Sequence, residues 1–116
     1  MFIDQETYKK INISVQELKE KIDKGEDFIL LDVREPNEYQ YSRIKEKEAM
    51  LVPMMSLPRV IDKLPKDKDI YVICRSGNRS LQATLWLRSK GFENVKNVEG
   101  GILAWSDYID PSVPKY

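Results

Sequence analysis

The chain has no histidine and only one cysteine among its 116 residues. The missing histidine removes the commonest general base and metal ligand from any site that the chain builds. One cysteine excludes an internal disulfide, and no apolar run approaches the length of a membrane span. Nineteen basic and nineteen acidic side chains cancel, so bulk charge gives no reason to expect nucleic acid or a membrane surface as a partner.

These absences also bound the class of protein. The segment Met1–Glu6 lacks the charged and apolar regions of a signal peptide, so we expect a cytoplasmic protein. We expect neither a metal nor a cofactor, and any catalysis must use cysteine, arginine, carboxylates and backbone dipoles. The length suits one domain over residues 1–116, with a core over about 11–105 and an irregular tail over 106–116.

Apolar runs alternate with helical segments along the chain. Strands are predicted at residues 28–33, 49–52, 70–73 and 94–98. Helices are predicted at residues 14–25, opened by a capping box, at 35–38, at 56–64, at 80–90, and after the glycine pair 100–101. This alternation predicts an α/β, three-layer fold with a mostly parallel sheet of about five strands and helices on both faces.

Cys74 stands where the predicted strand 70–73 meets the polar segment Arg75–Ser80. Ser80 is the expected N-cap of the following helix, whose free N–H groups and dipole favour the thiolate. Gly77 lets the loop backbone curl its N–H groups around one point, which makes an anion-binding nest. The alternative is a small buried cysteine at a strand end, and the neighbouring arginines and glycine disfavour it.

Apolar side chains in the helix after this loop recur at helical spacing. They are Leu81, Leu85 and Trp86, and this spacing predicts a helix from Ser80 to Lys90. Trp105 is the second tryptophan, and we interpret both tryptophans as core aromatics rather than as a substrate platform.

A second strand end is expected beside the cysteine. Asp32 and Arg34 end the preceding predicted strand, and the carboxyl ends of neighbouring parallel strands share one crevice, where ligands bind. An unpaired carboxylate would be costly in a buried strand, so we expect Arg79 to fold inward and pair with Asp32. Arg34 is expected to line the crevice or to form a salt bridge with Glu35 or Glu38.

Four motifs follow one another along the sequence. They are LDVREPNEY at 31–39, CRSGNRS at 74–80, GFENV at 91–95 and GGILAW at 100–105. Together they resemble the motifs of single-domain rhodaneses, a family of sulfurtransferases. The resemblance covers about residues 11–105, and it implies the rhodanese fold.

The resemblance also implies a reaction. Cys74 would take a sulfane sulfur from a donor such as thiosulfate, become a persulfide, and pass the outer sulfur to a thiophilic acceptor. Donor and acceptor are small molecules such as thiosulfate, cyanide or a thiol, or else a protein persulfide and a protein thiol. By the same matching, the backbone N–H groups of the active-site loop wrap the persulfide, and the loop consists of Arg75, Ser76, Gly77, Asn78, Arg79 and Ser80. Arg75, at the entrance, is expected to attract an anionic donor.

One stretch departs from the family pattern. Rhodaneses commonly have Gly-His-Ile followed by Pro-Gly-Ala, whereas this chain has Ser42-Arg43-Ile44 and then residues 45–49, KEKEA. The turn chemistry therefore differs, and the path of this loop is open. Because the family histidine is not the nucleophile, we expect activity to survive its absence.

Two alternatives use the same fold. Cysteine phosphatases and arsenate reductases need C-x5-R to enclose a tetrahedral anion, whereas Arg79 follows Cys74 as C-x4-R, which makes a tighter loop. The other alternative is a non-catalytic or sulfur-relay module that uses the fold to hold a protein partner. An intact loop around the cysteine favours the catalytic interpretation.

Overall fold

One five-stranded sheet organises the computed structural model, which describes residues 4–116. Its strand order is β1-β5-β4-β2-β3, and each neighbouring pair is parallel. The strands are β1 (Asn12–Ile13), β2 (Ile29–Asp32), β3 (Met50–Leu51), β4 (Ile70–Ile73) and β5 (Val95–Val98). The predicted α/β class and strand number are confirmed. Residues 1–3, part of the segment used to judge a signal peptide, lie outside the described residues.

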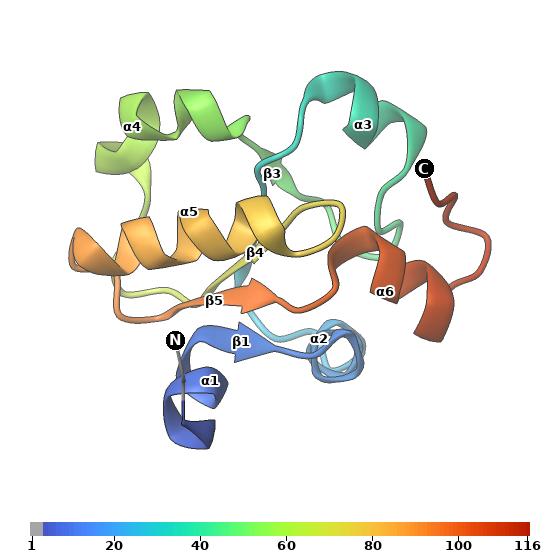
Figure 1. Cartoon of the computed structure of the whole chain (residues 1–116), viewed down its shortest axis with the longest axis horizontal. Coiled ribbons are helices and arrows are strands. Elements are labelled where there is room, and N and C mark those ends of the chain that lie inside the picture. The colour runs from blue at the N-terminus through green and yellow to red at the C-terminus, as the bar shows by residue number, and fades with distance from the viewer. Residues whose placement is uncertain (1–3) are drawn as a thin grey trace.

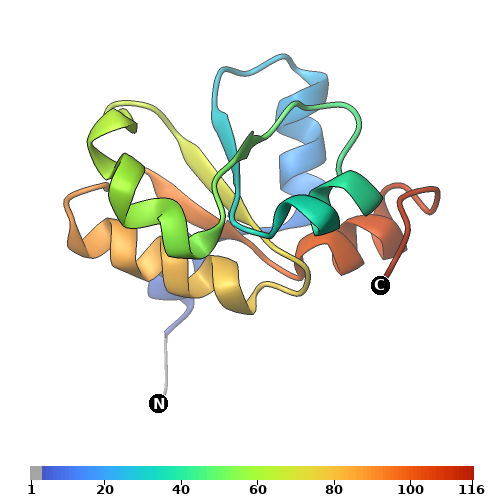
Figure 2. The same cartoon turned by 90° about the horizontal axis from the view of Figure 1, so that it is seen from above.

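Helices cover both faces of the sheet, as Figures 1 and 2 show. On one face lie α2 (Val15–Asp23) and α6 (Gly101–Tyr108), and on the other lie α4 (Leu57–Val60) and α5 (Asn78–Ser89). The remaining helices are α1 (Gln5–Ile11), before β1, and α3 (Pro36–Tyr41), after β2. No helix within residues 4–116 is long and apolar enough to cross a membrane.

The sheet separates two apolar clusters. Leu30 and Ile73 pack with Trp105 of α6 on one face, whereas Leu31 and Val72 pack with α5 on the other. Because parallel strands between two helical layers are buried on both faces, β2 and β4 have continuous rather than alternating apolar sequences. The sheet thereby holds the carboxyl ends of β2 and β4 side by side, with Asp32 in register with Ile73.

The helix after the cysteine differs from its prediction at its start. It begins at Asn78 with Gly77 as N-cap, so Ser80 lies inside the first turn and is not the cap. Leu85, one of the three apolar residues at helical spacing, is 49% exposed, and the buried face of the helix includes Ala83 and Leu87. Three of the buried residues, Ser80, Ala83 and Thr84, are small or polar, so apolar periodicity does not mark this face.

The structure also tests the predictions for the two tryptophans, for the helix at 56–64 and for the capping box at Ser14. Trp105 is fully buried, whereas Trp86 is only partly buried against the second cluster. The predicted helix 56–64 consists of three short turns, a 3-10 turn at Met54–Ser56, α4, and a second 3-10 turn at Ile61–Lys63. The capping box of Ser14 and Glu17 is confirmed at the start of α2.

The tail and the divergent loop at 42–49 hold each other in place. Residues 106–108 of the expected irregular tail belong to α6, and the rest of the tail has no helix or strand. The tail is not a surface segment throughout, because Val113 is fully buried in the core. Ser106 Oγ donates to the Val113 carbonyl oxygen at 2.7 Å, and Ser42 Oγ donates to the Pro114 carbonyl oxygen at 2.6 Å. Ile44 is buried, so the divergent loop is anchored in the core despite its altered turn chemistry.

Candidate active site

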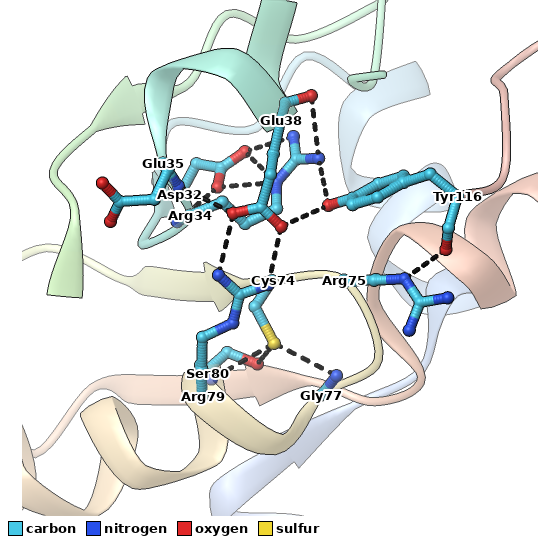
Figure 3. A network of polar contacts seen from close by, with 10 residues as sticks. All are labelled: Asp32, Arg34, Glu35, Glu38, Cys74, Arg75, Gly77, Arg79, Ser80 and Tyr116. Carbon is cyan, nitrogen blue, oxygen red and sulfur yellow. Dashed lines mark hydrogen bonds and ion pairs between the residues drawn. The ribbon is translucent and has the colours of Figure 1, made fainter. Parts of the chain in front are cut away.

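The sulfur of Cys74 lies in a cradle formed by the loop that follows β4 (Figure 3). The residue is 1% exposed, and its Sγ accepts hydrogen bonds from the backbone N–H groups of Gly77 at 3.1 Å and Ser80 at 3.3 Å. Gly77 has a φ of +103°, a conformation that favours glycine and turns its N–H toward the sulfur. Two backbone donors aimed at one atom suit a sulfur that carries negative charge.

Helix α6 holds the opposite side of the loop backbone. The N–H of Ile102 donates to the carbonyl oxygen of Cys74, and the N–H of Leu103 donates to that of Arg75, both at 3.0 Å. A Cβ on Gly101 would overlap these two carbonyl groups, so only glycine allows the close approach. The helix N-terminus therefore binds the loop carbonyl groups while loop N–H groups face the sulfur.

Asp32 pairs with Arg34, and the predicted pair with Arg79 is wrong. Both residues of the pair are buried, and Asp32 accepts from the Arg34 backbone N–H, from Nε at 3.0 Å and from Nη2 at 2.8 Å. Arg34 is only two residues from Asp32 in the sequence, and its side chain folds back onto the carboxylate. Asp32 therefore pairs with Arg34 and not with Arg79. Burial opposes the charge of Arg34, but the hydrogen bonds and charge of Asp32 outweigh burial and raise the pKa of Arg34.

Arg79 instead binds Glu38 of α3. Its Nη1 and Nη2 donate to the two carboxylate oxygens at 2.9 and 2.8 Å, and the Glu35 backbone N–H donates to Glu38 at 2.9 Å. These hydrogen bonds, with Arg79 the main cause, lower the pKa of Glu38 from 4.5 to about 2, and the pKa of Arg79 is raised in turn. The pair ties the first turn of α5 to α3, so Arg79 still braces the loop.

Tyr116 joins the site from the far end of the chain, and no sequence pattern indicated it. Its hydroxyl donates to Glu38 Oε1 and accepts from Arg34 Nη1, each at 2.9 Å. Arg75 Nε donates to the backbone carbonyl oxygen of Tyr116, and the Arg75 guanidinium lies 5.3 Å from the tyrosine ring centroid. Both ion pairs and Arg75 therefore meet at one tail residue, as Figure 3 shows.

The structure brings most predicted site residues together, but not in equal roles. Arg34 is buried with its carboxylate and does not pair with the Glu35 or Glu38 side chains, although its Nη1 donates to the Glu38 backbone at 3.3 Å. Ser76 and Asn78 are exposed. Within residues 4–116, the backbone N–H groups that bind the sulfur belong to Gly77 and Ser80, and not to Ser76 or Asn78. The side chains of Ser76 and Asn78 have no contact that assigns them a role.

Comparison with known proteins identifies the family. The model of the rhodanese-like domain matches residues 14–108. The chain is 37% identical over 101 residues to a sulfurtransferase of Allochromatium vinosum, covering 87% of this chain and 92% of that protein. It is 41% identical over 99 residues to a putative sulfurtransferase of Bacillus subtilis, covering 85% of this chain and 93% of that protein.

A solved structure agrees with these sequence relatives. The crystal structure of a rhodanese-like domain protein from Staphylococcus aureus has a TM-score of 0.76 and 28% identity, covering 91% of this chain and 98% of that one. Some relatives are longer. The chain spans 37% of a rhodanese-like/PpiC domain-containing chloroplastic protein of Arabidopsis thaliana, with 37% identity over 110 residues and 90% of this chain covered. The chain therefore belongs to the rhodanese-like domain family.

Proposed function

We propose that the protein is a rhodanese-type sulfurtransferase in which Cys74 carries a sulfane sulfur from a donor such as thiosulfate to a thiophilic acceptor. The cradle carries this proposal, because the backbone N–H groups of Gly77 and Ser80 both point at Sγ. Relatives that match the chain along nearly their whole lengths are named sulfurtransferases, which supports the same activity. The proposal treats residues 1–116 as one rhodanese-like domain.

The first half of the proposed reaction loads the sulfur. The Cys74 thiolate attacks the outer sulfur of thiosulfate, a new sulfur–sulfur bond forms, and the donor's own sulfur–sulfur bond breaks. Sulfite leaves with the bonding electron pair, so the charges of one thiolate and one thiosulfate become those of one persulfide anion and one sulfite. The loop N–H groups and the N-terminus of α5 face the charge that moves onto the outer sulfur.

The second half of the proposed reaction transfers this sulfur from Cys74 to the acceptor. An acceptor such as cyanide attacks the outer sulfur of the persulfide, the sulfur–sulfur bond on Cys74 breaks, and thiocyanate leaves while the thiolate returns. Neither half transfers a proton once Cys74 is ionised. A chain without histidine can therefore run the whole cycle, since no general base is required after the thiolate has formed.

Arg75 is the cation that we propose guides anionic donors to the sulfur. It is exposed, it follows the nucleophile directly, and Tyr116 holds it through its ring and its backbone carbonyl oxygen. The other two arginines of the site are already in ion pairs, Arg34 with Asp32 and Arg79 with Glu38. They support the loop, whereas Arg75, next to Cys74 in the sequence, has no Asp or Glu side chain as a partner within residues 4–116.

The position of Arg79 opposes the phosphatase alternative. A cysteine phosphatase needs its loop arginine to bind the phosphate, whereas both terminal nitrogens of Arg79 are bound to Glu38. The intact cradle likewise supports catalysis over a module that only binds a partner. The donor in the cell is then a small molecule such as thiosulfate or a protein persulfide, and the acceptor is a small thiophile or a protein thiol. We place this reaction in the cytoplasm, where a free cysteine stays reduced.

Thiocyanate formation from thiosulfate and cyanide tests the proposed function. We expect turnover by the wild-type protein and none by Cys74→Ser, which keeps a small polar side chain in the cradle. Arg75→Ala should raise KM for thiosulfate more than it lowers kcat, because the guanidinium acts on donor approach. A wild-type protein that forms no thiocyanate from thiosulfate, and takes no sulfur from a protein persulfide, would contradict the proposal.

A further inference from the structure

A chain of hydrogen bonds reaches the Cys74 sulfur through side chains that lie outside the active-site loop. Asn12 Nδ2 donates to the backbone carbonyl oxygen of Tyr8 at 3.1 Å. Asn97 Nδ2 donates to Asn12 Oδ1 at 2.9 Å, and Ser80 Oγ donates to Asn97 Oδ1 at 2.5 Å. The Ser80 hydroxyl oxygen in turn lies 3.2 Å from Cys74 Sγ (Figure 3). The chain runs from α1 through β1 and β5 to α5.

The orientation of each amide in this chain is fixed by the carbonyl group at its end. A backbone carbonyl only accepts, so the Asn12 nitrogen must face Tyr8 and the Asn12 oxygen must face Asn97. The Asn97 nitrogen then faces Asn12, which leaves the Asn97 oxygen facing Ser80. Turning either amide over would place two oxygen atoms in contact. Asn97 therefore presents an acceptor, and not a donor, to the Ser80 hydroxyl.

This arrangement leaves one proton for two contacts. The Ser80 hydroxyl has a single proton, and the amide oxygen of Asn97 holds it. The contact between Ser80 Oγ and the sulfur is then satisfied only when Cys74 is a thiol whose S–H donates to the hydroxyl oxygen. If Cys74 loses its proton, the Ser80 proton must leave Asn97 and turn to the sulfur. Ser80 is 0% and Asn97 4% exposed, so solvent replaces neither contact easily.

We propose that Asn97, with Asn12 behind it, is a positioning residue that sets the balance between thiol and thiolate at Cys74 by competing with the sulfur for the Ser80 proton. The inference depends on the proposed function only in taking Cys74 as the reacting sulfur. In this competition the Asn97 oxygen holds the hydroxyl proton, and negative charge on the sulfur draws that proton away from the amide.

Charged and titratable groups near the sulfur belong to other contacts and stay unchanged in the variants below. They are Arg75, the Arg79–Glu38 pair, the Asp32–Arg34 pair and the Tyr116 hydroxyl. The positioning residues themselves are uncharged amides. A change in the titration of the sulfur on replacing them therefore reports the hydrogen bonds and not a lost charge.

The pH profile of Cys74 alkylation tests this inference. Iodoacetamide reacts with the thiolate, and intact mass follows the reaction without ambiguity because the chain has one cysteine. Asn97→Leu removes the acceptor at similar volume, so the Ser80 proton is free for the sulfur. We expect the midpoint of the alkylation profile to fall by about 0.5–1 pH unit, the worth of one hydrogen bond. In a Ser80→Ala background the same substitution should not move the midpoint.

A second variant covers the case in which Asn97→Leu does not fold. Asn12→Ala frees the Asn97 amide to turn its nitrogen toward Ser80, so the midpoint should fall in the same direction. Asn94→Ala, on the exposed turn before β5, is the matched control and should match the wild type. An unmoved midpoint in both Asn97→Leu and Asn12→Ala, or an equal shift with and without Ser80, would overturn the inference.

The readout also separates this inference from the proposed function. Alkylation uses no sulfur donor and no acceptor. A protein that showed the expected shifts but never formed thiocyanate or a persulfide would support the role of Asn97 and overturn the sulfur-transfer proposal.

Discussion

Replacing Glu38 by glutamine tests whether its ion pair with Arg79 holds the active-site loop against α3. Arg79 is the main cause that lowers the pKa of Glu38 from 4.5 to about 2. Carried in full, that shift corresponds to about 3 kcal/mol of folding free energy. The Arg79 side chain is 36% exposed, so solvent screens the pair, and we expect Glu38→Gln to lower the free energy of unfolding by about 1–2 kcal/mol at pH 7.

The pH dependence gives this prediction its sharpest form. Because the pKa of Glu38 is lower in the folded protein, the pair contributes fully above about pH 4.5 and is lost as the pH falls toward 2. Urea unfolding of wild type and variant should therefore differ most near pH 7 and converge as the pH falls toward 2. Glu20→Gln, which breaks the exposed pair with Lys24 on α2, is the control and should change little. No difference at pH 7, or no convergence in acid, would refute the reasoning.

Three further substitutions test the supports of the site. Asp32→Ala leaves the buried Arg34 guanidinium without its partner, and urea unfolding should show a loss of about 3–5 kcal/mol. Gly101→Ala forces a methyl group against the Cys74 carbonyl at a φ of +57°, so the melting temperature and thiocyanate formation should both fall; a variant with wild-type values of both would contradict the close approach. Tyr116→Phe removes the hydroxyl that binds Arg34, and unfolding should show a loss of about 1 kcal/mol, with KM for thiosulfate little changed because the ring and backbone still hold the entrance cation.

The sequence predicted those parts of the site that depend on local patterns. An apolar run, a glycine and a helical segment place Cys74 at a strand end facing a helix start, and the sheet order then brings Asp32 alongside. The outcome followed because each pattern is set by neighbours in the chain. Strand β1 was not predicted, because two residues are too few to show a periodic pattern.

Contacts between distant segments could not be predicted in the same way. From the sequence, either Arg34 or Arg79 could pair with Asp32, because both carry the same charge. Only the fold shows that Arg34 folds back onto Asp32 while Arg79 turns to α3. Tyr116 reaches Arg34 across 82 positions of sequence, with no motif around it. Leu85 lies at helical spacing but is 49% exposed, whereas the small residues Ala83 and Ser80 of α5 are buried. Such choices depend on the shape of the packed helices, which composition and spacing do not encode.

The persulfide on Cys74 is the central claim, and intact mass tests it most directly. The protein is incubated with thiosulfate, freed of excess donor, and weighed beside Cys74→Ser treated in the same way. The account predicts a gain of one sulfur atom, about 32 Da, on the wild type alone, and its loss on adding cyanide or a thiol. A wild-type mass that stays unchanged with thiosulfate and with a protein persulfide would contradict it.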